Sequence, residues 1–228
     1  IVNNLAKTYY RWNTSINVTL RMPCGGELSA GPFHSQTPES WFFHVPGLKI
    51  VYPSTPQDAK GLLISSIDDP NPVLFFEHKG LYRSVKDEVP NGIYNLPLGK
   101  ANIVEKGDDA TIITYGKGVW WAKNIVKKIN ASVEIIDLRT ILPWDKKTVI
   151  ESVKKTNKVL VLHEANLTGG IGGEIASTIS NDAFEFLDAP VKRVASLDTP
   201  IPFASLIESD VYLPHQRFMN ELQNLIKY

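Results

Sequence analysis

The feature of the sequence that most constrains its fold is an alternation of strand-length apolar runs with segments of helical periodicity. Continuous apolar runs are typical of strands covered on both faces, and strands separated by helices predict a mostly parallel α/β sandwich. In the second half of the chain we expect strands at 110–118, 133–140, 158–165 and 190–198, and helices at 119–130, 145–156, 173–187 and 218–228.

The first part of the chain predicts shorter elements of the same kinds. We expect helices at 1–13, 38–45 and 55–69, and strands at 16–23, 48–54 and 72–79. Thr55 is the expected N-cap of the third helix, with Pro56 at the first helical position. Residues 83–100 combine prolines, glycines and charges without periodicity. We therefore place the domain boundary there and predict domains at 1–88 and 89–228.

Composition excludes several classes of partner. The chain has 24 Lys and Arg residues against 24 Asp and Glu residues, so no net field attracts it to nucleic acid or anionic lipid. Its single cysteine, Cys24, excludes an internal disulfide and a zinc site built from cysteines, and favours a reducing compartment. No apolar run approaches the roughly 18 to 20 residues needed to cross a bilayer. We expect neither a nucleic-acid nor a membrane partner.

The start of the chain is unusual. Ile1 stands where an initiator Met would be, and a helical pattern begins at once without a capping residue before it. We therefore expect further residues upstream in the native polypeptide.

One glycine-rich stretch, "HEANLTGGIGGEIAS", joins a predicted strand to a predicted helix, as phosphate-binding loops do. Its G-G-x-G-G spacing is not G-x-G-x-x-G, and Asp188 further on belongs to a turn. Close backbone packing or a subunit interface is the better interpretation. His163 and Glu164 are neighbours on a strand, so their side chains are expected on opposite faces and not to act jointly. The five histidines show no metal-binding spacing.

Two places could carry chemistry. The "SSIDDPNP" turn after a predicted helix exposes carbonyl oxygens, which bind either water or a hard monovalent cation. His34 lies in a loop of small residues, "GELSAGPFHSQTPES", directly after a predicted strand. An imidazole delivers protons well near neutral pH, although a lone loop histidine is more often simply solvated. From the residues alone, both interpretations of each place remain open.

Four ordered blocks resemble a known family: "LRMPCGGELSAGPFHSQTPESWFFHVPGLKIVYPSTPQDAKGLL", "NPVLFFEHKGLYR", "VEIIDLRTILPWD" and "HEANLTGGIGGEI". They are similar to the β subunit of thiamine-diphosphate-dependent 2-oxoacid dehydrogenases, the decarboxylating first components of the large complexes. The resemblance covers essentially the whole chain. Within the family, "HSQTPE" and "FFEHKGLYR" look more like the branched-chain (2-oxoisovalerate) enzyme than the pyruvate enzyme.

The resemblance implies two three-layer α/β domains. Residues 1–88 would form the C-terminal part of a pyrimidine-binding domain, and residues 89–228 a transketolase C-terminal domain with a mostly parallel sheet. It implies an α2β2 heterotetramer in which the α subunit, separate or fused, holds the diphosphate of thiamine diphosphate and Mg²⁺. The other implied partners are a second β subunit and a lipoyl acyltransferase. The implied compartment is the bacterial cytoplasm or, alternatively, the mitochondrial matrix.

The implied activity is oxidative decarboxylation of branched-chain 2-oxoacids with acyl transfer to lipoamide. The alternatives are a pyruvate or acetoin dehydrogenase β subunit, a transketolase-like enzyme, or an inert assembly fragment. By position, His34 matches the family's active-site histidine, a proton donor in acyl transfer. The family's potassium site, built mainly from main-chain oxygens, maps onto Ile16, Val18, Thr19, Ser66, Asp69 and Asn71. The pyrimidine-contacting glutamate and aromatic residue would lie upstream of Ile1, so the isolated chain is expected to be inactive.

Overall fold

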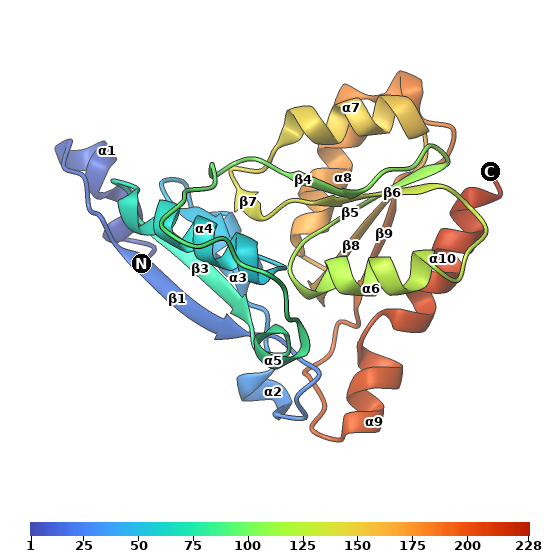
Figure 1. Ribbon diagram of the computed structural model, residues 1–228, viewed down its shortest axis with the longest axis horizontal. Helices are drawn as coiled ribbons and strands as arrows, with labels where there is room; N and C mark the ends of the chain where they lie inside the picture. The colour runs from blue at the N-terminus through green and yellow to red at the C-terminus, as the bar shows by residue number, and fades with distance from the viewer.

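Two β-sheets organise the computed structural model, which describes residues 1–228 (Figure 1). The first sheet has the order β1-β3-β2-β7 and the second has the order β4-β6-β5-β8-β9. The strands are β1 (Thr19–Cys24), β2 (Lys49–Val51), β3 (Val73–His78), β4 (Asn102–Glu105), β5 (Ala110–Thr114), β6 (Val133–Asp137), β7 (Thr140–Leu142), β8 (Val159–Asn166) and β9 (Lys192–Ser196).

Helices and short helical turns connect these strands. The α-helices are α1 (Thr8–Trp12), α2 (Gly31–His34), α3 (Glu39–Phe43), α4 (Pro56–Asp68), α5 (Leu81–Ser84), α6 (Lys117–Val126), α7 (Lys146–Thr156), α8 (Ile171–Asp182), α9 (Ser205–Ile207) and α10 (His215–Ile226). The 3-10 turns are η1 (Leu5–Lys7) and η2 (Phe184–Phe186), and η3 (Glu208–Tyr212) is a π-helical turn. None of the helices combines the length and the hydropathy needed to span a bilayer.

The second sheet is the middle of three layers. Helices α6 and α10 pack on one face and α7 and α8 on the other (Figure 1). Adjacent residues of β5 divide between the two faces: Ile112 belongs to the cluster under α6 and α10, and Ile113 to the cluster under α7 and α8. Strands β5, β6, β8 and β9 are parallel, and β4 is an antiparallel edge strand. The predicted mostly parallel sandwich is confirmed.

The first sheet is built around β3, which is buried along its whole length and pairs in parallel with both β1 and β2. Phe75 points toward α4, whereas Phe76 points into the core on the opposite face. Helix α4 begins as predicted: Pro56 is its first residue, and the Thr55 hydroxyl accepts a hydrogen bond from the Asp58 amide at 3.1 Å.

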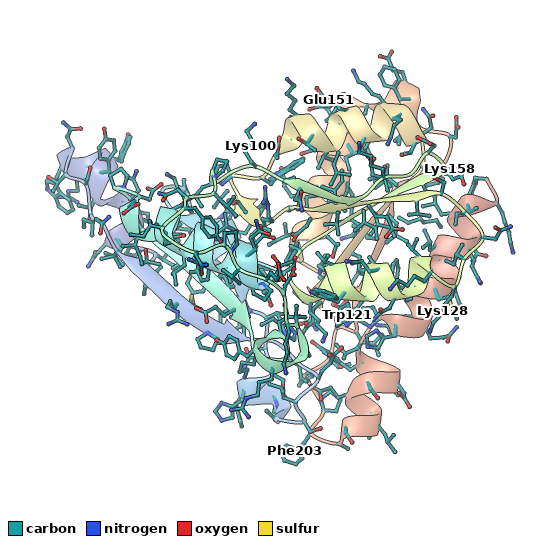
Figure 2. The ribbon with its side chains drawn as sticks, in the orientation of Figure 1. Lys100, Trp121, Lys128, Glu151, Lys158 and Phe203 are labelled. Atoms are coloured by element: carbon teal, nitrogen blue, oxygen red, sulfur yellow. The ribbon has the colours of Figure 1, made fainter.

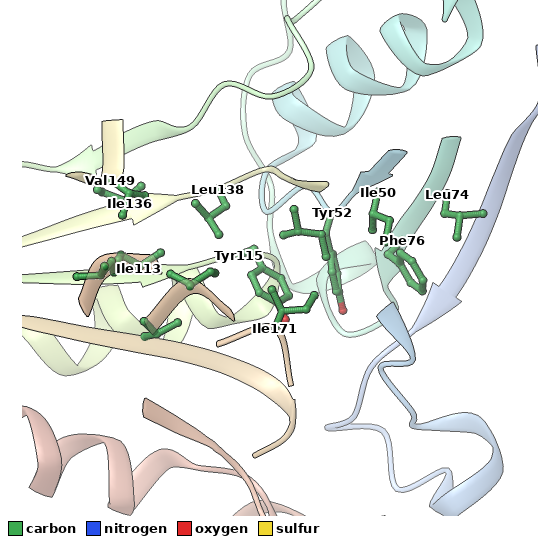
Figure 3. Packing of buried hydrophobic residues seen from close by; sticks show 14 of the residues in the cluster. Ile50, Tyr52, Leu74, Phe76, Ile113, Tyr115, Ile136, Leu138, Val149 and Ile171 are labelled. Atoms are coloured by element: carbon green, nitrogen blue, oxygen red, sulfur yellow. The ribbon is translucent and has the colours of Figure 1, made fainter. Parts of the chain in front are cut away.

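The two sheets share one hydrophobic core. Strand β7 comes from the second half of the chain but pairs antiparallel with β2 of the first sheet. Figure 3 shows the result: Tyr52 and Phe76 of the first part of the chain lie in a continuous cluster with Tyr115 and Leu138 of the second. The 21 buried residues of this cluster make the halves of the molecule one packed unit.

Six elements were not predicted: strands β4 and β7 and the short helical segments α2, α5, α9 and η3. Strand β4 has no apolar run because two of its four residues are exposed at the sheet edge, and β7 is three residues long. The loop around His34, expected to contain no helix, includes the single helical turn α2, which the proline at its second position favours. The helix expected at 1–13 is shorter, since Leu5–Lys7 forms a 3-10 turn and Asn13 ends α1 in a left-handed conformation.

Candidate functional site

The candidate site lies where the carboxyl ends of strands from both sheets meet. Strands β1 and β3 end at Cys24 and His78, and the amide of Gly26, just beyond β1, reaches Glu164 near the end of β8. The crevice outside the carboxyl ends of parallel strands is the usual place for ligands in open α/β sheets. The loop that carries His34 begins at this junction.

His34 is the last residue of α2, and its side chain is exposed. The turn that carries it is fixed through the main chain. The Ser35 amide donates to the Gly31 carbonyl at 3.1 Å, and the Gly25 amide donates to the Gln36 carbonyl at 2.9 Å. The Lys79 ammonium, just after β3, donates to the carbonyl oxygen of His34 itself. The backbone is therefore held while the imidazole remains free to contact a ligand.

A polar cleft of about 540 Å³ lies beside this turn, between the two domains. Its walls come from both sides of the molecule: Pro32, Gln36, Thr37, Pro38 and Trp41 from the first, and Asn166, Thr168, Asp198, Thr199, Pro200, Ile201 and Tyr212 from the second. The Thr168 amide and hydroxyl donate hydrogen bonds to the Asp198 carboxylate. These bonds are the main reason why the pKa of Asp198 lies below the usual value. The cleft beside the His34 turn is thus lined by the ionised carboxylate of Asp198, by side-chain amides and by the exposed indole of Trp41.

The second domain also covers α2 directly. Phe203 lies at the tip of the molecule next to α2 and α9 (Figure 2). A Cβ atom on Gly31 would come within 3.1 Å of the Phe203 ring, and Gly31 has a φ of +69°. Glycine is the residue that adopts this left-handed backbone without strain and leaves the Phe203 ring where it lies.

A second cavity, of about 440 Å³, lies at the carboxyl ends of β1 and β3 and beside the start of α4. Two of its lining side chains form a bidentate pair, because Arg21 donates to both oxygens of Glu77, and the Tyr82 hydroxyl donates to Glu77 at 2.7 Å. Burial alone would raise the pKa of Glu77, but its bonds with Arg21 and Tyr82 lower it below the usual value. These pairings satisfy the polar groups of an otherwise largely apolar cavity.

His163 and Glu164 have separate surroundings, as the strand alternation predicts. Glu164 accepts hydrogen bonds from the Gly26 amide and contacts His78 Nε2, both at 2.6 Å. His163 is fully buried, stacks near Tyr115 and has a pKa lowered by burial to about 4. Cβ atoms on Gly170 and Gly172 would meet the His163 ring at 2.4 and 2.7 Å. Close packing is therefore the reason for glycine at these two positions.

The residues expected to bind potassium lie just before and at the start of β1 (Ile16, Val18 and Thr19), in the last turn of α4 (Ser66) and between α4 and β3 (Asp69 and Asn71). The two segments are in contact. The Thr19 hydroxyl donates to the Ser66 carbonyl at 2.8 Å, and the Asn17 side-chain amide donates to the Ile67 and Asp69 carbonyls at 2.7 Å each. Lys49 pairs with the Asp69 carboxylate. Carbonyl oxygens do converge here, and the Asn17 amide bridges two of them.

Sequence reasoning missed Asn17, Lys79, Glu164 and Glu208 as residues that hold these segments. Glu208 is 2% exposed and accepts hydrogen bonds from the Glu27 and Ser29 amides at 3.0 and 2.9 Å. No local pattern could have found it, because its partners lie about 180 positions earlier in the chain. No three His, Cys, Asp or Glu side chains are grouped so that they could hold a metal ion.

Comparisons with known proteins agree with this architecture. Residues 3–85 match the transketolase pyrimidine binding domain, and residues 99–217 match the transketolase C-terminal domain. A solved structure described as a split-gene transketolase in an inactive β4 tetramer has a TM-score of 0.77 to the chain, over 93% of this chain and 68% of that one. At 18% identity this likeness shows the fold alone.

The chain is more similar in sequence to another group of proteins than to this solved structure. The chain is 48% identical over its whole length to the mitochondrial 2-oxoisovalerate dehydrogenase subunit beta of Dictyostelium discoideum, and it spans 63% of that protein. Over 91% of its length it is 45% identical to the 2-oxoisovalerate dehydrogenase subunit beta of Bacillus subtilis (strain 168), of which it covers 65%. The chain thus spans less than two thirds of the length of these relatives.

These matches confirm the resemblance and the fold class inferred from the sequence. Together they cover both sheets and the cleft between them. The chain therefore belongs to the transketolase family, with sequence of that family's pyrimidine-binding domain followed by its C-terminal domain.

Proposed function

We propose that this chain is part of the β subunit of a branched-chain 2-oxoacid dehydrogenase, which decarboxylates 2-oxoacids such as 2-oxoisovalerate and passes the acyl group to lipoamide. The observation that carries the proposal is the identity of 40–48% to 2-oxoisovalerate dehydrogenase β subunits of a slime mould and two bacteria, over nine tenths or more of the chain. The position of His34 beside an inter-domain cleft supports it.

In this proposal His34 donates a proton during acyl transfer. When the acyl group bonds to one sulfur of the lipoyl disulfide, the other sulfur leaves as a thiolate and needs a proton. An imidazole supplies protons readily near neutral pH. The exposed His34 ring on a main chain fixed by Lys79 suits a donor that must meet a mobile lipoyl group.

The proposed cofactor is thiamine diphosphate with Mg²⁺, shared with an α subunit or a fused α domain. Thiamine diphosphate supplies the carbanion that adds to the 2-oxo carbon and retains the electron pair when carbon dioxide leaves. The residues of this chain fit one wall of such a site, since His34, Gln36 and Trp41 line or adjoin the cleft. The proposed holder of the diphosphate and Mg²⁺ is the α partner; in this chain no three His, Cys, Asp or Glu side chains are grouped to hold a metal ion.

A structural potassium ion is also proposed, at the junction of β1 with the α4–β3 turn. The Ser66, Ile67 and Asp69 carbonyls already converge there. Turning the Asn17 side-chain amide by 180° would present its oxygen, in place of its nitrogen, to the same point. Main-chain and amide oxygens are suitable ligands for a hard monovalent cation, so the donor set fits this ion.

The proposed assembly is an α2β2 heterotetramer that delivers acyl groups to a lipoyl acyltransferase. Relatives come from mitochondria and from bacteria, and the bacterial cytoplasm is the proposed compartment, with the mitochondrial matrix as the alternative. The competing functions are those of a pyruvate or acetoin dehydrogenase β subunit, and of an assembly module without activity. Tight binding of thiamine diphosphate by the isolated chain in calorimetry would exclude the assembly module.

The intact protein, assembled with its α partner, thiamine diphosphate and Mg²⁺, should decarboxylate 2-oxoisovalerate with a higher kcat/KM than pyruvate. Replacing His34 by Ala should lower acyl transfer to lipoamide by roughly 100-fold and leave decarboxylation with an artificial electron acceptor within a few-fold of the wild type. A higher kcat/KM for pyruvate would show that the subfamily assignment is wrong. Unchanged acyl transfer in H34A would remove the role given to His34.

A further inference from the structure

Two buried carboxylates of the second domain hold the loop that leads from β1 to His34. Glu208, the first residue of η3, accepts hydrogen bonds from the Glu27 amide at 3.0 Å and the Ser29 amide at 2.9 Å. Glu164, near the end of β8, accepts one from the Gly26 amide at 2.6 Å. Both carboxylates are almost completely buried, Glu208 to 2% and Glu164 to 6% exposure. We call residues 25–29 with these two carboxylates the loop clasp.

The backbone of the loop is shaped to bind these anions. Gly25, Glu27 and Ser29 have φ values of +95°, +62° and +51°. Alternating left-handed residues turn successive amide groups toward one side and form a concave nest for an anion. Left-handed conformations of non-glycine residues persist where the surroundings over-determine them. The Glu208 carboxylate is the partner that compensates for this strain at Glu27 and Ser29.

The clasp leaves no free space around Gly26. A Cβ atom there would lie 3.0 Å from Glu208 Oε1 and 3.3 Å from Glu164 Oε1. A side chain of the loop also contacts the second domain. The Glu27 carboxylate pairs with Lys117 at 2.9 Å and accepts a hydrogen bond from the Trp121 indole at 2.7 Å. Burial alone would raise the pKa of Glu27, but Lys117 and Trp121 lower it. The loop is therefore held to the second domain from both directions.

The clasp connects mechanically to His34. At one end Gly25 donates to Gln36, two residues after His34, and at the other end Ser35 donates to Gly31. Residues 25–36 thus form a closed segment. The main-chain amides of this segment that donate to carboxylates of the second domain are the three amides of the clasp. A small shift of the clasp would move the His34 imidazole with it, and a misplacement of about 1 Å can reduce a rate by roughly 100-fold.

We propose that Glu208 is a positioning residue: through the loop clasp, it sets where the His34 imidazole lies in the inter-domain cleft. The catalytic part of this inference rests on the proposed function. Glu208 is a sharper probe than Glu164, because its side-chain hydrogen bonds are both to the loop, whereas Glu164 also contacts His78.

The test uses the intact β subunit assembled with its α partner, carrying Glu208→Gln. The amide keeps the shape of the side chain but replaces one acceptor oxygen with a donor. Amide hydrogen exchange in residues 25–36 should accelerate about tenfold, while exchange in β5 stays unchanged. Acyl transfer to lipoamide should fall about 10- to 100-fold in kcat with little change in KM for the 2-oxoacid. Glu221→Gln, on an acid that is 40% exposed on α10, should change neither quantity.

A double variant separates positioning from general destabilisation. If Glu208 acts through His34, adding E208Q to H34A should cause no further loss of acyl transfer, because the group that it positions is already absent. An additional loss equal to that in the wild-type background would overturn the proposal, as would faster exchange with unchanged acyl transfer. If the wild-type assembly turns over no 2-oxoacid, the proposed function fails, and unchanged exchange in E208Q would independently overturn the clasp.

Discussion

Glu39 lies five positions after His34 and is completely buried. Its Oε1 accepts a hydrogen bond from the Tyr115 hydroxyl at 2.8 Å, whereas Oε2 has no partner. Burial raises the pKa of this carboxyl to about 8, against an ordinary value of 4.5. Glu39 is therefore mostly a neutral acid at neutral pH, close to the boundary between the two domains.

This pKa makes stability depend on pH. Between pH 4.5 and about 8 the folded protein retains the Glu39 proton while the unfolded chain releases it, so stability decreases as pH rises through that window. Glu39→Gln should flatten the decrease: the variant should lose about 1 kcal/mol or less at pH 5 and be more stable than the wild type at pH 8. Thermal unfolding at both pH values would measure this.

The matched control is Glu151→Gln on the exposed face of α7 (Figure 2). It should shift the unfolding midpoint equally little at both pH values. A pH dependence as steep in E39Q as in the wild type would contradict the assignment of the proton to Glu39. Asp137, whose pKa burial raises to about 7, contributes in the same direction and would remain in both variants.

Residue-scale predictions from sequence succeeded where the signal was local. Thr55 was identified as an N-cap because Pro56 follows it at the first helical position, and the amide that it caps, that of Asp58, is only three positions away. The loop clasp could not be identified, because Gly26 and Glu164 are separated by 138 positions and Ser29 and Glu208 by 179. A sequence shows that such residues are polar and acidic, but the fold decides which of them meet.

Helix α8 packs directly against His163 of β8. Gly172 and Gly173 are adjacent in its first turn, but their surroundings differ. A Cβ atom on Gly172 would lie 2.7 Å from the ring of the buried His163, whereas one on Gly173 would lie 3.2 Å from the flexible end of Arg193. The two positions form a natural pair for comparing packing with helix propensity.

Gly172→Ala should destabilise the protein by about 1 to 3 kcal/mol, because the buried imidazole and β8 must shift to admit the methyl group. Gly173→Ala should be neutral or stabilise it by up to about 1 kcal/mol, because Ala is the better helix former. Denaturant unfolding of both variants would measure the difference. Equal effects at the two positions would show that packing against His163 does not determine the choice of glycine.

At the scale of elements, burial decided what the sequence could reveal. Strand β3 is buried along its whole length, and its apolar run predicted it nearly to the residue. Strands β4 and β7 have no comparable apolar run in the sequence. Two of the four residues of β4 are exposed, and β7 is recognised as a strand by its pairing with β2. Strands defined by a partner rather than by their own pattern are invisible before the fold is known.

For the molecule as a whole, the shared core predicts that the two sheets unfold together. Leu225 of α10 is fully buried and belongs to a hydrophobic cluster whose members all come from residues 110–225. Leu225→Ala should cost about 2 to 5 kcal/mol. Because the 21-residue core cluster joins the sheets, the loss should appear equally in the hydrogen exchange of β3, in the first sheet, and of β5, in the second.

The control for this prediction is Leu206→Ala, at a leucine that is 74% exposed, which should alter neither strand. If L225A accelerates exchange in β5 and leaves β3 protected as in the wild type, the sheets open independently and the shared core does not couple them.

The pairing of β7 with β2 also has a consequence for biosynthesis. A ribosome releases β2 roughly 90 residues before β7, so the edge of the first sheet stays unpaired until much of the second domain has emerged. An unpaired edge is a template for pairing with other chains. During synthesis this edge is therefore open to pairing with other chains until residues 140–142 arrive and cover it.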